Sequence, residues 1–242
     1  MTDWKFQTAR DHGLPTAQRL RSTLRERGLG SHAIAAAWQQ LTRAYLRVGH
    51  RFRVEGREHL PEPPFVLVGN HSSHLDALAL AAALPHRLAA RAFALAAGDT
   101  FFATKPLAAF AAYAINALPV WRNRTSAQDI KGLRARLHED GAVLILFPEG
   151  TRTRTGEMGP FRPGIGALVA GTDVPVVPCY LHGAFDAWPA DRRLPRPLRL
   201  RLQIGPPLTF PEPATNRAAL NAVSAACEAA VRALAVPKAP NS

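Results

Sequence analysis

The sequence predicts an α/β fold whose mostly parallel central sheet is flanked by helices and preceded by an N-terminal helical segment. Two observations lead to this prediction. Short runs of aliphatic and β-branched residues alternate along the chain with helical patterns, which is typical of βαβ units. The strongest runs, FVLVG (65–69) and AVLILF (142–147), are apolar throughout, as expected for strands that are covered on both faces.

Residues 1–50 form the predicted N-terminal segment, which is basic and amphipathic. Ser31 is a candidate N-cap for a helix over roughly residues 32–49. The large apolar residues of this helix recur at steps of three and four, so they share one stripe: Ile34, Trp38, Leu41, Tyr45 and Val48. Such a stripe packs on the core or, with arginines beside it, lies on a membrane.

Residues 51–210 hold the predicted sheet, and residues 211–242 a final helix and tail. The first half of this region is predicted to hold an edge strand at 51–56, strand 65–69 and a helix at 75–84. An alanine-rich helical region then runs to about residue 117, interrupted at Pro85 and Gly98, and a helix over 126–141 lies between Ser126 and Gly141. The second half is predicted to hold strand 142–147, a strand at VPVVPCYL (174–181), a half-exposed strand at 198–205 and a helix over 214–235. The prolines of 174–181 suggest a sheet edge or a bend.

The charge of the chain indicates an anionic partner. The net charge is +12, which suits nucleic acid, an anionic membrane surface or a phosphorylated substrate. The two cysteines lack the paired spacing of a disulfide framework. The polar N-terminus has no apolar core, so we expect no signal peptide. The longest uncharged stretch, 106–121, is shorter than the roughly 20 residues of a transmembrane helix and predicts a buried helix or an interfacial segment.

The cluster NHSSHLD (70–76) directly follows strand 65–69, at the carboxyl end where open α/β sheets bind ligands. If His71 lies in the turn and Asp76 in the first turn of the helix, their side chains can meet. The carboxylate would then fix the tautomer of the imidazole and raise its basicity. The other ring nitrogen could take a proton from a hydroxyl, and a substrate can supply that hydroxyl.

Other interpretations of this cluster stay open. His71, His74 and Asp76 are plausible metal ligands, although their H-x2-H-x-D spacing matches neither HxHxDH nor H-E-x-x-H. Ser72 and Ser73 most simply cap the helix. The whole cluster also fits a capped turn with incidental histidines.

A second polar cluster, FPEGTRTRTG (147–156), follows strand 142–147. Its small and hydroxyl residues, with Arg152 and Arg154, suit a phosphate held by backbone N–H groups and guanidinium bonds. Glu149 is unexpected in an anion site unless it orients an arginine or the loop. The Walker pattern is absent, which argues against a nucleoside triphosphate. A plain surface turn is the alternative.

Weaker signals complete the set. Arg122 and Arg124 end the apolar stretch of LPVWRNR (118–124), where solvated arginines are common. The run 174–181 can form the wall of an acyl site or simply a core strand. Cys179 has no evident base partner, and the G-x-S-x-G motif of serine hydrolases is absent.

In order and spacing, these motifs resemble the glycerolipid acyltransferase superfamily of the lysophosphatidic acid acyltransferase type. NHSSHLD is similar to the family's first motif, N-H-x4-D, and FPEGTR matches the third in every position. GPFRPG (159–164) resembles the F-K-x-G that follows it, with Arg162 in place of lysine, and Pro178 matches the proline of the fourth motif. The resemblance covers roughly residues 50–210. The second motif departs from the pattern, since Leu118 and Trp121 stand at its aromatic and acidic positions.

The resemblance implies a glycerol-3-phosphate acyltransferase-like fold and a role for each motif residue. His71 would act as general base on the acceptor's glycerol hydroxyl, oriented by Asp76, and the oxygen would attack the thioester of acyl-CoA or acyl carrier protein. The acceptor, most simply 1-acyl-glycerol-3-phosphate, would become phosphatidic acid. The residues implied in holding its phosphate are Arg122, Glu149, Gly150, Thr151 and Arg152, with weaker support for Arg124, Arg162 and Pro178.

The resemblance also implies no metal, no bound cofactor and no nucleic-acid partner. It implies an enzyme attached peripherally or monotopically to the cytoplasmic side of an anionic membrane, without a clear transmembrane helix. Two alternatives stay open: an acyltransferase for another lyso-lipid, such as a lyso-ornithine lipid, and a non-enzymatic basic membrane-binding protein. The second alternative leaves the pairing of H-x4-D with FPEGTR unexplained.

Overall fold

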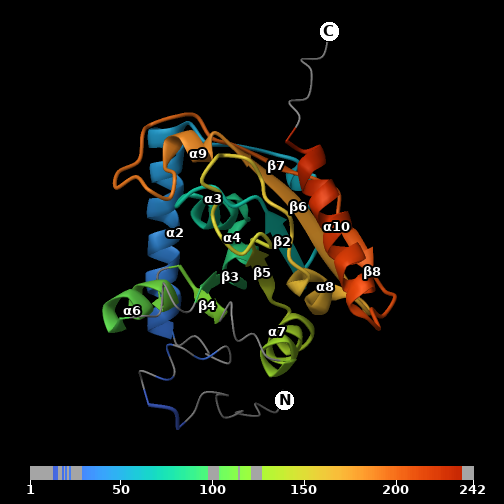
Figure 1. The fold of residues 1–242 in the computed structure, drawn as a ribbon. Coiled ribbons are helices and arrows are strands. Elements are labelled where there is room, and N and C mark those ends of the chain that lie inside the picture. Colours follow the sequence, from blue (N-terminus) through green and yellow to red (C-terminus); the bar gives the residue numbers. More distant parts are fainter. Residues whose placement is uncertain are drawn as a thin grey trace.

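The computed structural model describes residues 13–15, 18, 20, 22, 29–97, 104–113, 115–120 and 127–235, and within them the predicted α/β fold is confirmed. A mostly parallel sheet runs through the middle and helices cover both of its faces (Figure 1). The described strands are β1 (Arg53–Glu55), β2 (Phe65–Gly69), β3 (Ala92–Ala97), β4 (Ala117–Val120), β5 (Val143–Leu146), β6 (Thr172–His182), β7 (Arg201–Ile204) and β8 (Leu208–Phe210). Their order is β1-β7-β6-β2-β5-β3-β4, and β8 pairs with β6.

The two faces of the sheet follow from the alternation of side chains along each strand. On β2, Phe65 and Leu67 pack on one face, whereas Val66 and Val68 pack on the other. The helices are α2 (Leu29–His50), the 3-10 turn η1 (Arg57–His59), α3 (Asp76–Ala83), α4 (His86–Ala89), α6 (Lys105–Tyr113), α7 (Ala127–Asp140), α8 (Gly164–Val169), α9 (Ala184–Ala187) and α10 (Arg217–Ala233). Helices α2 and α3 cover the first face, and α7, α8 and α10 the second.

The alanine-rich region is the main error of the sequence prediction. We expected helix as far as about residue 117, but the chain forms β3 and β4 there, parallel to each other. Alanine favours helix locally, yet β3 also pairs with β5, and this tertiary pairing outweighs local propensity. The stretch 106–121 is correspondingly divided between α6 and β4, so it is not one buried or interfacial helix.

Strand β6 corrects a second expectation. It lies inside the sheet, between β2 on one side and β7 and β8 on the other, so the predicted edge position is wrong. The Pro178 carbonyl accepts a hydrogen bond from the N–H of Gly205 (2.8 Å), the residue directly after the end of β7. Because the nitrogen and the carbonyl of a strand residue point to the same side, the proline nitrogen, which has no hydrogen to donate, also faces this point just past the end of β7. The pairing of β6 with β8 shifts register between Thr172 and Val176, the part of the strand that contains Pro175.

Strand β7 is less exposed than predicted. Leu202 and Ile204 belong to the core, and Gln203 is buried on the opposite side of the strand. The Gln203 amide oxygen bonds His182 Nε2 at 2.7 Å, and the same His182 nitrogen also meets the carbonyl of Leu234. A polar residue in an alternating pattern was therefore not a sign of exposure, because neighbouring strands and the end of α10 satisfy its hydrogen bonds.

Helix α2 has the predicted stripe, but most of the stripe does not pack on the core. Ile34, Leu41, Tyr45 and Val48 are exposed, while the side that packs inward carries Leu46. Trp38 is half-buried and meets Phe110 of α6 edge-on, with ring centroids 5.1 Å apart. Within the described ranges, no helix has both the length and the apolar character that crossing a membrane requires.

Candidate active site

The carboxyl end of β2 carries the NHSSHLD turn. Asn70 fixes this turn to the neighbouring strand, because its amide nitrogen donates to the Leu181 carbonyl (3.2 Å) and its amide oxygen accepts from Leu181 N–H (2.8 Å). Both groups of a buried side chain are thus satisfied by β6. The turn starts from a rigid position, which suits residues whose side chains must meet accurately.

The predicted contact between His71 and Asp76 is confirmed. His71 Nδ1 lies 2.8 Å from Asp76 Oδ2, and the carboxylate is fully buried whereas the imidazole is 24% exposed. The same oxygen accepts hydrogen bonds from the N–H groups of Ser72 (2.7 Å) and Ser73 (2.8 Å). A carboxylate held by these donors keeps the proton of His71 on Nδ1, which leaves the lone pair of Nε2 available as a base.

The environment of the pair restricts the imidazole further. The ring of His71 stacks on Phe147, with centroids 4.4 Å and planes 16° apart. Ser72 and Ser73 do not cap α3 as expected, since the N-cap residue is Leu75 and makes no side-chain cap. The Ser73 hydroxyl instead accepts from Leu75 N–H and donates to the Trp188 carbonyl (2.7 Å). Ser73 therefore joins the turn to the segment that follows α9.

Glu149 joins the two polar clusters. Its Oε1 accepts from His71 N–H at 2.6 Å, and its Oε2 accepts from Gly159 N–H at 2.8 Å. The side chain is buried, and burial raises its pKa above the ordinary glutamate value, while the two backbone N–H groups act in the opposite direction. Both carboxylate oxygens are thus directed at backbone N–H groups. This arrangement fits the interpretation that Glu149 orients the loop better than the interpretation that it contacts the phosphate directly.

Arg152 lies beside the pair and is held by His74. Its Nη1 is 2.8 Å from both ring nitrogens of His74, which also hydrogen-bonds the Ala190 backbone. Burial, and secondly the positive charge of Arg152, lower the pKa of His74, so a neutral imidazole accepts from the guanidinium. His74 in turn packs on Trp188, with ring centroids 4.9 Å apart.

The remaining predicted site residues are placed as follows. Gly150 has a φ of +76°, a backbone conformation that favours glycine, and a Cβ there would lie only 2.9 Å from Arg162 Nε. The loop therefore needs glycine at position 150, with the Arg162 side chain packed directly against it. Arg162 Nε also donates to the Glu149 carbonyl at 3.2 Å. Thr151 is exposed, and Pro178 lies within β6, opposite Val68 of β2. Arg122 and Arg124 lie outside the described residues.

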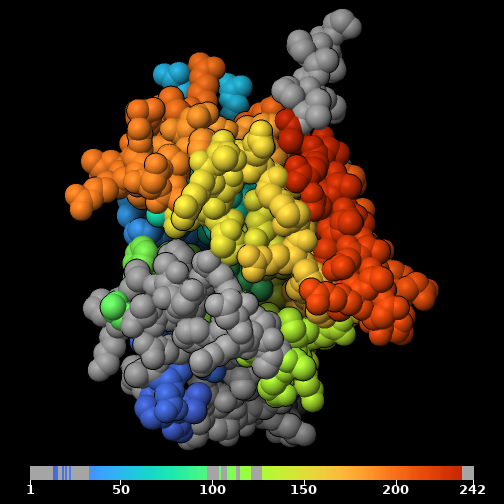
Figure 2. All heavy atoms as spheres, viewed as in Figure 1, coloured from blue at the N-terminus to red at the C-terminus, as the bar shows by residue number. Residues whose placement is uncertain are grey.

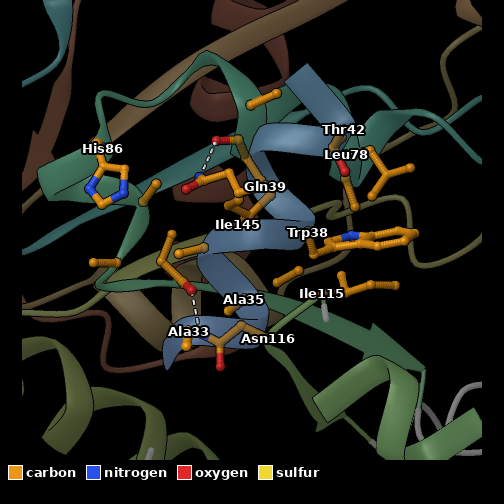
Figure 3. Close-up of a pocket in the computed structure, with 18 residues that line it drawn as sticks. Ala33, Ala35, Trp38, Gln39, Thr42, Leu78, His86, Ile115, Asn116 and Ile145 are labelled. Atoms are coloured by element: carbon orange, nitrogen blue, oxygen red, sulfur yellow. Dashed lines mark hydrogen bonds between the residues drawn. The ribbon is translucent and has the colours of Figure 1, made fainter. Parts of the chain in front are cut away.

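A cavity of about 690 Å³ opens beside the histidine–aspartate pair. His71, Gly150 and Arg152 form part of its lining, and most of the rest is apolar, including Leu78, Leu95, Phe110, Ile115 and Leu146. A second cavity of about 330 Å³ adjoins it beneath α2, and both are lined by Trp38, Leu78 and Ile115. Figure 3 shows the indole of Trp38 between Leu78 and Ile115, three residues that line both cavities.

Sequence reasoning missed several residues of this site. Trp188 and Pro195 line the larger cavity, although the segment around them carries no recognisable motif. Leu41 and Tyr45 also line it, although the sequence linked their stripe only to the core or a membrane. Phe147 is the first residue of the FPEGTR motif, but the sequence assigned no role to its ring, which stacks on His71.

Two rival chemistries receive no geometric support from the residues that the structure describes. No group of three or more His, Cys, Asp or Glu side chains comes together there in a way that could hold a metal ion. Cys179 is buried, and burial raises the pKa of its thiol far above the ordinary value, which disfavours the thiolate that a nucleophile needs. The geometry instead suits activation of a hydroxyl by His71.

Fold and site together define an α/β protein in which a histidine–carboxylate base faces an apolar cavity. Residues 51–182 match the family model described as Acyltransferase. This match covers more than half of the chain, so the protein belongs to the acyltransferase family, and the family suggested by its motifs is confirmed.

Curated relatives give the family a more specific context. The chain is 32% identical over 168 residues to the mouse 1-acyl-sn-glycerol-3-phosphate acyltransferase alpha, across 66% of this chain and 56% of that protein. It is 30% identical over 168 residues to a chloroplastic 1-acyl-sn-glycerol-3-phosphate acyltransferase of Brassica napus, across 65% of this chain and 44% of that protein. The chain therefore spans about half the length of the relatives it matches.

A solved structure extends the similarity of fold to nearly the whole chain. The crystal structure of the 1-acyl-sn-glycerophosphate acyltransferase PlsC from Thermotoga maritima superimposes with a TM-score of 0.64 at 21% sequence identity. The match covers 92% of this chain and 89% of that one. At this level of identity the likeness establishes the fold.

Proposed function

We propose that this protein transfers a fatty acyl group from acyl-CoA or acyl carrier protein to the free hydroxyl of 1-acyl-glycerol-3-phosphate, which yields phosphatidic acid. One observation carries the proposal: the His71–Asp76 pair, 2.8 Å apart, borders an apolar cavity of about 690 Å³ whose wall also holds Arg152. The names of the relatives support the same substrate class. Residues 51–210 would form the catalytic unit, with 1–50 and 211–242 attached to it.

In the proposed reaction, His71 Nε2 takes the proton of the acceptor hydroxyl while the hydroxyl oxygen attacks the thioester carbonyl. A new C–O bond forms and the C–S bond breaks. The leaving thiolate then takes the proton back from the imidazolium, so the base is regenerated. Asp76 remains ionised throughout and stabilises the imidazolium through its 2.8 Å contact with Nδ1.

The acceptor's phosphate would bind at the FPEGTR loop. Arg152 is the main candidate, because it lines the cavity beside His71 and has its guanidinium oriented by His74. Gly150 and Thr151 would contribute from the same loop, and Arg122 and Arg124 from the segment LPVWRNR (118–124). Glu149, Arg162 and Pro178 would act by shaping this loop and the adjoining strand, since their observed contacts are with backbone.

The decisive assay measures release of free thiol from an acyl thioester by the purified full chain. Release should require 1-acyl-glycerol-3-phosphate and should yield phosphatidic acid by mass spectrometry. Monoacylglycerol, which lacks the phosphate, and a lyso-ornithine lipid are the comparison acceptors. Turnover with the lyso-ornithine lipid alone would assign a different acceptor, and no acceptor-dependent release with either donor would refute acyl transfer.

Substitution of Arg152 should separate binding from chemistry. A charge-assisted hydrogen bond is worth about 1.5–3 kcal/mol, so Arg152→Ala should raise KM for the lysophospholipid roughly tenfold to 150-fold. KM for the acyl thioester should change little, and Arg152→Lys should recover only part of the loss because lysine lacks the planar fork. Arg217→Ala, at an exposed position on α10, is the control. An effect confined to the acyl donor would contradict the assignment.

We also propose attachment to the cytoplasmic face of an anionic membrane through the exposed stripe of α2 and the basic residues before it. Each arginine or lysine near an anionic surface contributes about 1 kcal/mol, so binding should weaken with salt. High salt or carbonate should extract much of the protein from membranes, as measured by immunoblotting of the soluble and pelleted fractions. Recovery only after detergent treatment would indicate an embedded segment instead.

A further inference from the structure

The exposed apolar residues of the protein are concentrated in three places. We name residues 191–199 the Leu-Arg loop. Eight large apolar side chains are exposed in the described part of the chain, and seven of them lie on α2, on α6 or in the Leu-Arg loop. These seven are Ile34, Leu41, Tyr45 and Val48 on α2, Phe110 on α6, and Leu194 and Leu198 in the loop. Val48 is 82% exposed and Leu194 is 75% exposed. Leu194 of the Leu-Arg loop is thus nearly as exposed as the most exposed residue of the α2 stripe.

Hydrogen bonds hold the Leu-Arg loop in one position. Trp188 Nε1 donates to the Arg192 carbonyl (3.0 Å), and Arg196 N–H donates to the Ala187 carbonyl (2.8 Å). At the other end, His50 at the end of α2 bonds the Leu198 carbonyl through Nδ1 (3.0 Å). The loop therefore sits beside α2, and its atoms project from the body of the protein in the space-filling view (Figure 2, orange).

The residue types of the Leu-Arg loop match one kind of surface. Its sequence, DRRLPRPLR, alternates leucines with arginines, and Arg193, Arg196 and Arg199 are exposed. The two prolines lack N–H groups and therefore expose fewer unpaired donors. Leucines favour the acyl region of a bilayer, while guanidinium groups favour the phosphates above it. An anionic lipid surface satisfies both preferences at once.

The position of the cavity agrees with this partner. Leu41 and Tyr45, from the stripe of α2, line the larger cavity on one side, and Trp188 and Pro195 line it on the side of the Leu-Arg loop. The two exposed apolar segments therefore flank the cavity that contains His71. A bilayer that contacts both segments would adjoin the cavity, so a lipid acceptor could enter without crossing water.

We propose that the Leu-Arg loop is a second membrane-docking element, which inserts Leu194 into an anionic bilayer while Arg193, Arg196 and Arg199 bind lipid phosphates. The inference rests on the membrane attachment proposed above. It adds a segment far from α2 in the sequence, and it orients the cavity toward the lipid.

The cysteine content of the chain allows a direct test. The only two cysteines, Cys179 and Cys227, are buried, so Leu194→Cys creates a single accessible thiol for an environment-sensitive fluorophore such as NBD. Vesicles containing phosphatidylglycerol should shift the emission of the labelled full chain to the blue and increase its intensity. Arg217→Cys on α10, on the side of the protein away from α2, should give no shift with the same vesicles (Figure 1).

Charge reversal supplies the second readout. Arg196→Glu and Arg199→Glu should each lower the vesicle partition coefficient at least about fivefold. Arg217→Glu makes the same change in net charge and should leave partitioning unchanged. Equal losses with all three variants, an equal blue shift at positions 194 and 217, or no shift at 194 would each overturn the proposal and point to unspecific adsorption or a protein partner.

The proposed reaction can fail independently of this inference. Turnover measured with acceptor dispersed in neutral detergent micelles tests acyl transfer without a bilayer. A protein that inserts residue 194 into vesicles but releases no thiol in micelles supports the docking loop and refutes the proposed acyl transfer. A protein that is active in micelles but shows no shift at residue 194 refutes the docking loop alone.

Discussion

Substitution of His71 by alanine is expected to lower kcat by about 10²–10⁴-fold or more, because it removes the proposed general base. The fold should survive. Asp76 keeps the hydrogen bonds that Ser72 N–H and Ser73 N–H donate to its carboxylate, and the imidazole it loses is 24% exposed. Thiol release at saturating acceptor gives kcat, and thermal unfolding checks the fold. His138→Ala, at an exposed position on α7, is the control.

The companion substitution, Asp76→Asn, tests the orientation of the same base. An asparagine amide can donate to His71 Nδ1, which moves the imidazole proton to Nε2 and blocks the nitrogen that should accept the substrate proton. A loss of kcat similar to that of His71→Ala is expected, together with a modest loss of stability at the fully buried position. If His71→Ala kept more than half of the wild-type kcat, the assignment of the base would be wrong.

The contact between these two residues was predictable because it is local. A buried strand, a short polar turn and a helix bring residues 71 and 76 close together, and distant residues such as Glu149 then fix the position of the turn. The same holds for β2, β5, α3 and α7, whose patterns are strong over their own length. Where the sequence pattern and the tertiary environment agree, a short stretch is enough to predict the local geometry.

The errors arose where distant residues decide the outcome. AFALAA became β3 because β4 and β5 lie on either side of it, and a stretch with four alanines among its six residues gives no local sign of that pairing. The prolines of β6 are tolerated inside the sheet because one neighbouring strand ends and another begins beside them. Trp188 contacts Ser73 and His74, which are far from it in sequence, so no local pattern indicates its place in the site.

Glu149 shows the same limit within a recognised motif. Its place in FPEGTR suggested a role in holding the substrate, yet its oxygens accept from His71 N–H (2.6 Å) and Gly159 N–H (2.8 Å). A carboxylate that faced the phosphate would repel it. We therefore infer that Glu149 is a positioning residue, which fixes the backbone of His71 against the loop that carries Gly150 and Arg152.

Substitution of Glu149 by glutamine should consequently impair chemistry more than binding. Glutamine keeps one acceptor oxygen but turns a donor toward the second N–H group, and a buried donor left unpaired costs about 1–3 kcal/mol. The free energy of unfolding should fall by about that amount, and kcat should fall because the His71 backbone is no longer fixed. Glu157→Gln, an exposed carboxylate on the same loop, should change neither quantity.

The KM for the lysophospholipid distinguishes this role from direct substrate contact. If Glu149 acts only through the backbone, Glu149→Gln leaves KM for the acceptor close to the wild-type value while kcat falls. If the carboxylate instead faced the phosphate, removing its negative charge would strengthen acceptor binding and lower KM. An unchanged kcat with a changed acceptor KM would therefore reject the positioning role. Chemical denaturation of Glu149→Gln and of its control Glu157→Gln, measured together with the kinetics, distinguishes a loss of kcat caused by unfolding from one caused by misplacement of His71.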